Sequence, residues 1–331
     1  MAVKIEKKTI LAVFDAHECS LSLPELAVKI DHTVSERTLR RWLAHWVDEG
    51  ILRKSGHRRS TRYELIITNA EPTFQFLIGL SPSKKTALIK QLRDLWTHTS
   101  TAIEGNTLTL GDTHFVLEEG LTIFGTSIKD HQEVIGHAKA IDILYQSLNK
   151  PITERSIFDL HKAVQTDNVT DIYKPNGLWK IEPNGTYVVT KNDEQVYIEY
   201  ALPSEVPYLM REILIAINAA NQQPIEMGNA HNIYAKLHVG LAHTHPFWDG
   251  NGRIARLLSN IPLLRAGLPP IVIPKQERKI YIQLLAEYQL SIGQISQETG
   301  VWPKLAVLIE FEEFIERCYS VTKLLVEKAH Q

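Results

Sequence analysis

The sequence has little cysteine, no long apolar run and almost no net charge. Its 331 residues include only two cysteines, Cys19 and Cys318, which lie near opposite ends of the chain. This excludes a small disulfide scaffold and is typical of a reducing compartment. No stretch approaches the ~20 apolar residues that span a bilayer. The opening MAVKIEKKTI lacks the apolar core of a secretory signal. We therefore expect a cytoplasmic protein with no membrane contact.

The charge balance excludes a chain that attracts polyanions over its whole surface. The formal net charge is −2, with 44% hydrophobic and 22% charged residues, as in a soluble globular protein. The length suits about two domains, at roughly 100 to 200 residues each. Pro72, Gly79 and Pro82 mark a junction within residues 69–85. We place the domain boundary there.

The stretch HPFWDGNGRIAR, residues 245–256, concentrates side chains that suit phosphate chemistry. His245 can take a proton near neutral pH. Asp249 can hold a hard cation such as Mg²⁺, which prefers carboxylate and phosphate oxygens. The Gly-Asn-Gly turn at 250–252 lets the backbone approach a ligand, because glycine has no side chain and tolerates positive φ.

A helix is expected directly after this turn. Apolar residues recur at helical spacing from Ile254 to Ile261, and free N–H groups at a helix N-terminus attract anions. Arg253 and Arg256 lie three apart, so both can clamp one extended polyphosphate. Pro262 falls within the helical run, where it predicts a kink. Taken singly, these residues fit a packed histidine, a plain turn or a solvated helix face, but their combination favours a phosphate site.

This segment resembles the signature of the Fic family, H-P-F-x-[DE]-G-N-G-R-x-x-R, at every defined position. The resemblance covers roughly residues 80–330. It implies transfer of AMP from ATP to a Ser, Thr or Tyr hydroxyl of a target protein, with release of pyrophosphate. It also implies that His245 is the general base and that Asp249 holds Mg²⁺. The implied ATP and phosphate contacts are Gly250, Asn251, Gly252, Arg253 and Arg256.

The resemblance also divides the phosphates among these residues. Asn251 would touch the α-phosphate, Arg253 the β-phosphate and Arg256 the γ-phosphate. Such a division agrees with the physical expectation that the protein positions phosphates and neutralises charge that develops during transfer. The base must lie within hydrogen-bond reach of the attacking hydroxyl.

A second motif, TSTAIEGN, ends a helix expected over about 83–104. It resembles the inhibitory [ST]-x-x-x-E-[GN] pattern that precedes the Fic core in one class of the family. Ser100 and Glu104 are four apart and share a helix face, and the glycine after them can end the helix. The resemblance implies an inhibitory helix over about 95–106, in which Glu104 pairs with Arg256 and Ser100 hydrogen-bonds the glutamate. The alternative is an ordinary solvated glutamate at a helix end.

Residues 1–70 resemble a winged helix-turn-helix domain. The expected elements are a helix over 5–17, a short helix beginning near Pro24, a helix that Ser35 caps and Gly50 ends, and a hairpin within 51–65.

The segment 37–62 gives this domain a local positive charge. It holds eight Lys/Arg residues and two acidic residues, and such a cluster attracts phosphate backbones. The N-terminal end of a recognition helix usually touches bases. The alternative is a protein-docking or dimerisation module, because a fold does not fix a function. The candidate DNA contacts are Arg37, Arg40, Arg41, Arg58 and Arg59.

The section 177–210 interrupts the helical pattern with alternating apolar and polar residues around Asn192-Asp193, which predicts a β-hairpin. It resembles the Fic flap, a hairpin that holds the target peptide by strand pairing. Lys180 stands where an arginine is frequent, and the Pro-Asn-Gly insert at 183–185 lengthens the approach. The alternative is a plain surface hairpin.

Two further sets of side chains remain. The helix over 231–245 contains four histidines, but they lack the spacing and the nearby acid of a zinc site. We expect His238 to pack behind the active site. The segment ERKIYIQLLAEY resembles a Fic helix beside the nucleotide, which makes Tyr281 and Tyr288 candidates for adenine-side contacts.

The expected fold is mainly α: a winged helix-turn-helix domain over 1–70, followed by an all-α Fic domain over 80–331 with one β-hairpin flap. The expected function is a protein adenylyltransferase that uses ATP and Mg²⁺ and acts on a target protein or on itself. One alternative is a DNA-binding transcriptional regulator whose Fic domain senses nucleotide. Another is a relative that removes AMP or transfers a different phosphate-containing group. Duplex DNA through residues 1–70 and a homodimer are further expected partners, the second by analogy with Fic relatives.

Overall fold

The described residues of the computed structural model fall in two compact units. The description covers residues 10, 13–14, 20–30, 34–48, 52–56, 60–65, 74–165, 171–190 and 194–331. Unit 1 comprises Met1–Glu71 with Asn149–Thr153, and unit 2 comprises Pro72–Leu148 with Glu154–Gln331. The stretch 245–256, whose side chains suit phosphate chemistry, therefore belongs to unit 2.

The helix α2 (Leu23–Lys29) of unit 1 begins at a capping box. Ser22 accepts a hydrogen bond from the backbone of Glu25, whose carboxylate accepts from the backbone of Ser22 in return. This exchange satisfies donors that a helix N-terminus leaves without partners. Pro24 lies in the first turn, where its missing N–H costs nothing.

The helix α3 (Glu36–Asp48) starts as the sequence predicts. The Ser35 hydroxyl accepts from the Thr38 N–H at 3.3 Å, so the predicted cap is confirmed. A hairpin of β1 (Leu52–Ser55) and β2 (Arg62–Leu65) follows, paired antiparallel. The buried core of unit 1 consists of Ile10, Phe14, Leu21, Leu26, Ala27, Ile30, Leu39, Leu43, Trp46 and Leu52.

Part of the predicted N-terminal domain lies outside the described residues. This applies to most of the helix expected over 5–17 and to Gly50, the predicted end of the helix that Ser35 caps. It also applies to Arg58 and Arg59. The three arginines predicted on α3 are described, and their side chains are exposed. These are Arg37, Arg40 and Arg41.

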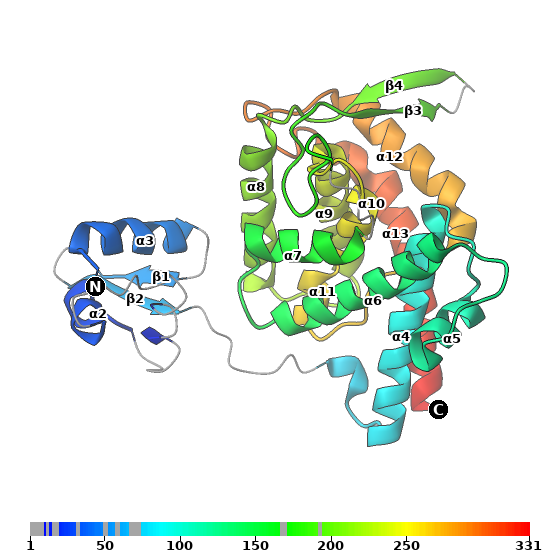
Figure 1. Ribbon diagram of the computed structural model, residues 1–331, viewed down its shortest axis with the longest axis horizontal. Helices are drawn as coiled ribbons and strands as arrows, with labels where there is room; N and C mark the ends of the chain where they lie inside the picture. The colour runs from blue at the N-terminus through cyan, green and yellow to red at the C-terminus, as the bar shows by residue number, and fades with distance from the viewer. Residues whose placement is uncertain are drawn as a thin grey trace. The chain divides into compact units, whose positions relative to one another are not determined.

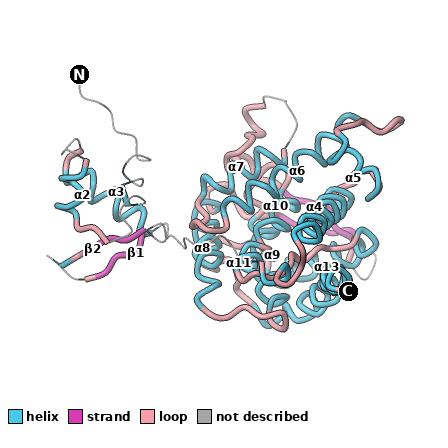
Figure 2. The backbone as a smooth tube through the Cα atoms, turned by 90° about the horizontal axis from the view of Figure 1, so that it is seen from below, coloured by secondary structure: helices cyan, strands magenta, loops and turns pink. Residues whose placement is uncertain are grey.

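Unit 2 is built mainly from helices, with one hairpin at its edge (Figures 1 and 2). Its α-helices are α4 (Pro82–Ile103), α5 (Leu110–Glu119), α6 (Ile128–Ser147), α7 (Glu154–Val164), α8 (Val206–Ala219), α9 (Ala230–Thr244), α10 (Asn251–Leu258), α11 (Ile261–Arg265), α12 (Arg278–Ile292) and α13 (Ile309–His330). The 3₁₀ turns are η2 (Gln75–Leu77), η3 (Ala220–Gln222), η4 (Lys275–Glu277) and η5 (Leu305–Leu308). None of the helices in the described ranges combines the length and the apolar character needed to cross a bilayer.

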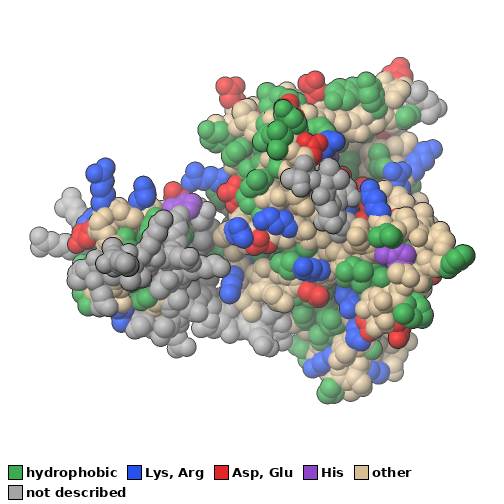
Figure 3. Space-filling model, viewed as in Figure 1, with side chains coloured by type: hydrophobic (Ala, Val, Ile, Leu, Met, Phe, Trp, Pro, Cys, Tyr) green, Lys and Arg blue, Asp and Glu red, His purple; other side chains and the backbone are tan. Residues whose placement is uncertain are grey.

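The helix α9 forms the centre of unit 2. It packs against α8, α10 and α13, and Figure 1 shows it enclosed by them. Tyr234, Ala235 and Val239 of α9 are at most 1% exposed. Its C-terminus therefore delivers residue 245 to a fixed place at the edge of the core. On the face that Figure 3 shows, acidic and basic side chains are interspersed over unit 2, which agrees with the net charge near zero.

The long helix α4 ends where the inhibitory motif was predicted. Glu104 is its C-cap, and Gly105 has a φ of 106° that favours glycine. Arg278 of α12 donates from Nε to the Ile103 carbonyl at 2.6 Å. This bond satisfies one of the carbonyls that a helix C-terminus leaves open and fixes the end of α4.

The prediction of a kink within one helix at Pro262 is wrong, because the chain forms two separate helices there. α10 ends at Leu258, and Pro262 lies in the first turn of α11, where proline is tolerated. Asn260 stabilises the break. Its side-chain amide donates to the carbonyl of Ile271 at 2.9 Å, and its Oδ1 accepts from the Ile271 N–H at 2.7 Å.

The predicted hairpin is present as β3 (Gly185–Val189) and β4 (Gln195–Glu199), paired antiparallel. Successive side chains of a strand point to opposite faces. Val188 and Ile198 are buried with Ala286 of α12, so one face of the hairpin packs on that helix. The opposite face exposes Tyr187 and Tyr197, whose rings lie 4.9 Å apart.

Candidate active site

The site begins at the C-terminus of α9 with His245. This residue has φ 48° and ψ 59°, and its N–H donates to the Leu241 carbonyl at 3.0 Å. In the described part of the chain, His245 is the one non-glycine residue with a positive φ. A left-handed conformation is costly for such a residue and persists only where its surroundings fix it. The geometry turns the chain sharply, so that α10 starts beside the end of α9.

The imidazole of His245 is stacked and held neutral. Its ring lies 3.6 Å from the Tyr200 ring at an interplanar angle of 3°. Burial, and next the charge of Lys180, lowers the pKa of His245 to about 3. Nδ1 lies 3.3 Å from the Ala242 carbonyl, which can only accept, so Nδ1 carries the proton. Nε2 is therefore left with a free lone pair and can act as a base.

The loop between α9 and α10 is closed by Asn251. Its Oδ1 accepts from the Phe247 N–H, and its Nδ2 donates to the Phe247 carbonyl, both at 2.8 Å. The side chain that the resemblance assigned to the α-phosphate is thus engaged in fixing the loop. The backbone N–H of Asn251, at the start of α10, remains the group that suits an anion.

His161 of α7 supports this loop from outside, a role that the sequence analysis missed. Its Nδ1 accepts from the Gly177 N–H at 2.9 Å, so its Nε2 carries the proton and donates to the Asp249 carbonyl at 3.0 Å. Its ring stacks on Phe247 at 3.8 Å. Burial lowers the pKa of His161 to about 4, which keeps this tautomer neutral.

The N-terminus of α10 has the form of an anion site. Gly250 is its N-cap with a φ of 78°, and no side chain caps the first turn. The N–H groups of that turn and the helix dipole favour negative charge. Gly252 leaves the approach open, because a Cβ there would lie 2.5 Å from Glu104 Oε1. A carboxylate therefore already occupies the space beside this helix end.

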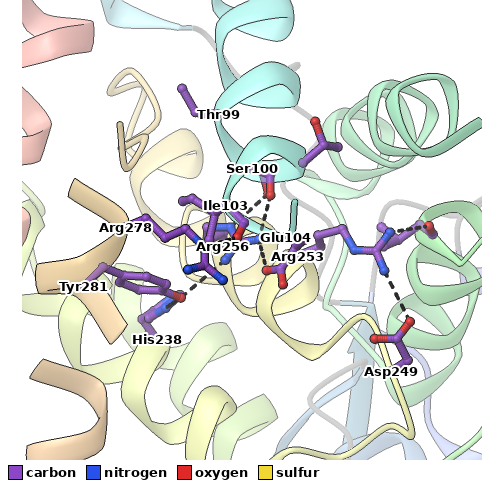
Figure 4. A network of polar contacts seen from close by, with 12 residues as sticks. Thr99, Ser100, Ile103, Glu104, His238, Asp249, Arg253, Arg256, Arg278 and Tyr281 are labelled. Atoms are coloured by element: carbon purple, nitrogen blue, oxygen red, sulfur yellow. Dashed lines mark hydrogen bonds and ion pairs between the residues drawn. The ribbon is translucent and has the colours of Figure 1, made fainter. Parts of the chain in front are cut away.

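Arg256 is the most heavily bonded side chain of the site (Figure 4). Its Nη2 donates to Glu104 Oε1 at 2.5 Å and to the Ser100 carbonyl at 2.9 Å. Its Nε donates to Ser100 Oγ at 2.9 Å, and its Nη1 donates to Tyr281 Oη at 3.3 Å. The Arg256 side chain is 2% exposed, whereas that of Glu104 is 39% exposed. Burial opposes the charge of Arg256, but the Glu104 carboxylate together with Tyr281 and Tyr234 outweighs this effect and raises the pKa of the guanidinium.

The contacts of Ser100 differ from the prediction. Ser100 was expected to hold the glutamate, but in the structure its hydroxyl and its carbonyl both accept from Arg256. The reason is geometric: Arg256 reaches α4 from the side and lies between Ser100 and Glu104. Ser100 therefore orients the guanidinium, and the guanidinium in turn holds the carboxylate.

Arg253 and Asp249 form the outer half of the site. Arg253 is 6% exposed and donates to the Val164 carbonyl at 3.2 Å, and its Nη2 lies 3.6 Å from Asp249 Oδ2. Partial burial opposes ionisation of Asp249, but the charge of Arg253 and the hydrogen bonds from Gly250 and Gln165 together outweigh this effect, so the pKa of the carboxyl lies below its usual value. The Asp249 side chain is 59% exposed. It is thus an ionised oxygen ligand that a cation could reach.

This donor set fits Mg²⁺ only together with a substrate phosphate. Within the described ranges, no group of three or more His, Cys, Asp or Glu side chains could hold a metal ion. Mg²⁺ commonly binds through one or two carboxylates, substrate phosphates and water. Asp249 beside the uncapped end of α10 matches that arrangement.

The adenine-side role of Tyr281 and Tyr288 stays a prediction, and the structure shows what surrounds the two side chains. Tyr281 and Tyr288 are each 4% exposed and belong to the hydrophobic core. The Tyr281 hydroxyl accepts from Arg256 and lies 2.8 Å from His238 Nε2. Tyr281 therefore supports Arg256 from behind, and His238 packs behind the site as expected.

The comparisons with known proteins cover the same part of the chain. Residues 151–263 match the family model described as the Fic/DOC family. Protein adenylyltransferase Fic from Drosophila virilis is 34% identical over 213 residues, which are 62% of this chain and 39% of that protein. The chain thus spans well under half the length of this relative.

Two solved structures extend the likeness to the fold. A Fic domain containing signaling protein from Bacteroides thetaiotaomicron aligns with a TM-score of 0.67 and 29% identity, over 78% of this chain and 94% of that chain. Fic-1 from Caenorhabditis elegans aligns with a TM-score of 0.54 and 23% identity, over 96% of this chain and 83% of that chain. The second likeness shows the fold alone.

Proposed function

We propose, on the premise that residues 151–263 match the Fic/DOC family model, that the chain is a protein adenylyltransferase held inactive by Glu104. The observation that carries the proposal is the meeting of three groups at one helix end. A neutral imidazole, an uncapped helix N-terminus and two buried arginines converge there. This set suits in-line attack on a bound triphosphate.

The proposed reaction uses His245 as the base. Its Nε2 takes the proton of a Ser, Thr or Tyr hydroxyl on the target. The hydroxyl oxygen forms a bond to the α-phosphorus of ATP, and the bond from that phosphorus to the bridging oxygen breaks to release pyrophosphate. The N–H groups at the start of α10 offset the charge that develops on the α-phosphate. The alternative reaction is the removal of AMP from a modified target by water, which would use the same groups.

Mg²⁺ is the proposed cofactor, and when bound it would neutralise charge between the phosphates. Asp249 is the residue that would hold it. Arg253 and Arg256 would bind the outer phosphates, because a guanidinium can donate two parallel hydrogen bonds to one phosphate. ATP is the proposed substrate.

The target is proposed to bind at the flap. The edges of a two-stranded sheet present unpaired N–H and C=O groups, to which an extended peptide can pair. The hairpin β3–β4 also exposes Tyr187 and Tyr197 on its outer face, with 68% and 47% of each residue exposed. Aromatic side chains of this kind are frequent in protein interfaces. The target can be another protein or a second copy of this chain.

Autoinhibition is proposed to act through competition for Arg256. The guanidinium binds Glu104 and cannot offer the same donors to a γ-phosphate. The carboxylate also lies beside the N-terminus of α10, where it would repel a phosphate. ATP could still bind, but with its α-phosphate turned away from attack, and a misplacement of about 1 Å can cost about 10²-fold in rate.

The proposal is tested by the variant Glu104→Gly. At saturating MgATP, we expect its initial rate of AMP transfer to itself or to lysate proteins to exceed that of the parent by about tenfold or more. ATP affinity should change less. Glu104→Gln is the matched control, because it keeps the shape and removes the charge, and its rate should fall between the two. Equal rates for all three folded, ATP-bound proteins would show that Glu104 is an ordinary helix-end residue.

A separate role is proposed for unit 1, as a winged helix-turn-helix domain that binds duplex DNA. The support is its order of helices and hairpin, together with the exposed arginines of α3. The N-terminal half of α3 carries Arg37, Arg40 and Arg41, of which Arg40 also pairs with Glu36 at 3.4 Å. A protein partner in place of DNA is the alternative.

A further inference from the structure

Lys180 is a buried lysine beside the site that the proposed reaction does not use. Only 2% of this residue is exposed. Its Nζ donates to Asn184 Oδ1 at 2.6 Å and lies 5.9 Å from the centre of the Tyr200 ring. The described residues place no carboxylate within ion-pair distance of it. Burial lowers the pKa of Lys180 to about 7. Burying an ammonium among neutral groups is costly. Because no ion pair with a described residue offsets that cost, the position of Lys180 needs another explanation.

The partner of Lys180 connects both sides of His245. Because Asn184 Oδ1 accepts from the lysine, Nδ2 of the same amide points the other way and donates to the Phe247 carbonyl at 3.0 Å. The backbone carbonyl of Asn184 accepts from the Tyr200 N–H at 3.2 Å. Tyr200 carries the ring that stacks on His245. Asn184 therefore contacts the loop after the histidine through its side chain, and the strand end that carries the stacked ring through its backbone.

A third contact joins the segment that carries Lys180 and Asn184 to the loop after His245. The backbone N–H of Lys180 donates to the Pro246 carbonyl at 2.9 Å, next to the histidine in sequence. A side-chain amide can be turned by half a rotation, which exchanges its donor and its acceptor. In its ammonium form the lysine has donors only, and this form permits one of the two orientations of Asn184. Without it, the bond to Phe247 would compete with the opposite orientation.

We infer that Lys180 is a positioning residue for the proposed transfer: it orients the Asn184 side chain, which fixes the loop after His245, while the backbone of Asn184 holds Tyr200 against the imidazole. The inference rests on the proposed function for its effect on rate. The arrangement of the imidazole is a separate property that can be measured without any transfer. Displacing a catalytic group by about 1 Å can cost about 10²-fold in rate.

The experiment compares Lys180→Met, Lys180→Arg and Asn184→Asp on the Glu104→Gly background. Methionine keeps the apolar stem and removes the donor, arginine keeps a charged donor, and aspartate keeps the contact to the lysine but cannot donate to Phe247. The rate readout is AMP transfer at saturating MgATP, with ATP affinity measured beside it. The second readout is the ¹³C-histidine NMR signal of His245, assigned by its loss in His245→Ala. The stacked Tyr200 ring shifts this signal, so it reports the arrangement directly.

We expect Lys180→Met and Asn184→Asp each to lower the transfer rate by about tenfold or more. ATP affinity should stay within about twofold, because neither residue contacts the phosphate side. Both variants should move the His245 signal toward its unstacked position, and Lys180→Arg should retain the parent signal. The double variant Lys180→Met/Asn184→Asp should be no slower than the slower single one, because both changes interrupt the same chain of contacts from Lys180 through Asn184 to Phe247.

Three results overturn the inference: an unchanged His245 signal in Lys180→Met, a signal that moves equally in Lys180→Arg, or single effects that multiply in the double variant. If Glu104→Gly transfers no AMP, the proposed function fails, while the NMR signal still decides the role of Lys180. If Lys180→Met does not fold, Asn184→Asp decides by the same signal, since it leaves the lysine in place with an acidic partner.

Discussion

The two units hold their arginines in opposite ways. In unit 2, Arg253 and Arg256 are 6% and 2% exposed, and each lies against an acidic side chain. In unit 1, Arg37 and Arg41 lie exposed on α3. Removing a charge from water costs on the order of several kcal/mol, so a buried arginine is kept only where directed partners offset that cost. An exposed arginine needs no such partners, and its position alone says little about what it binds.

The difference predicts that substitutions in the buried site have large, specific effects and that those on α3 have small, salt-dependent ones. Each of the following experiments tests one part of that contrast.

The largest effect is expected for His245→Ala on the Glu104→Gly background. Transfer should fall by about 10²- to 10⁴-fold, because the neutral imidazole is the proposed general base and Asp249 is proposed to hold the metal ion. ATP binding, measured by calorimetry, should be retained. A transfer rate within about threefold of the background would show that His245 is not the base.

A smaller effect is expected for Asp249→Ala. ATP affinity of the parent should rise with Mg²⁺, and the variant should lose about tenfold or more of that gain, because the carboxylate and the phosphates share the ion. Asp249→Asn is the matched control, since it keeps the size of the side chain and loses its charge. Identical Mg²⁺ titrations for the variant and the parent would remove Asp249 from the metal site.

The smallest effect is expected on α3. The full chain should bind duplex DNA weakly, with an affinity that falls as salt rises, because arginine contacts release counterions. Replacing Arg37 and Arg41 by alanine should weaken binding and reduce the salt slope by about one per lost phosphate contact. AMP transfer by the same protein is the control and should not change. Binding that is absent at low salt, or indifferent to salt, would favour a protein partner for unit 1.

The contrast also explains how far the sequence could predict the site. The loop over 245–256 could be predicted because its residues are contiguous, and contiguous spacing fixes which side chains share a turn or a helix face. The pair of Glu104 and Arg256 is present in the structure, and the motif around Ser100 suggested it although 152 residues separate the two partners. A resemblance supplied what spacing could not.

The supporting residues had no such signal. His161 and Asp249 are separated by 88 residues, and only the packing of α7 on the loop brings them together. The Asn184 carbonyl accepts from the Tyr200 N–H, and the Tyr200 ring stacks on His245. No residue pattern in the sequence encodes either contact. The contacts of Tyr281 were not predicted for the same reason. Its segment resembles a Fic helix beside the nucleotide, but a helical pattern cannot distinguish a ring facing a nucleotide from one facing Arg256.

The missing β-carbon of Gly252 bears on the strength of the proposed inhibition. Glu104 Oε1 lies within 2.5 Å of the place where that atom would be. The carboxylate is therefore an anion tethered to the site, and a short tether holds its local concentration at roughly millimolar or above. A free nucleotide competes with it on those terms, so added ATP alone would displace the glutamate only in part. Release would depend on whatever moves the end of α4, and Gly252 leaves the same space open for either anion.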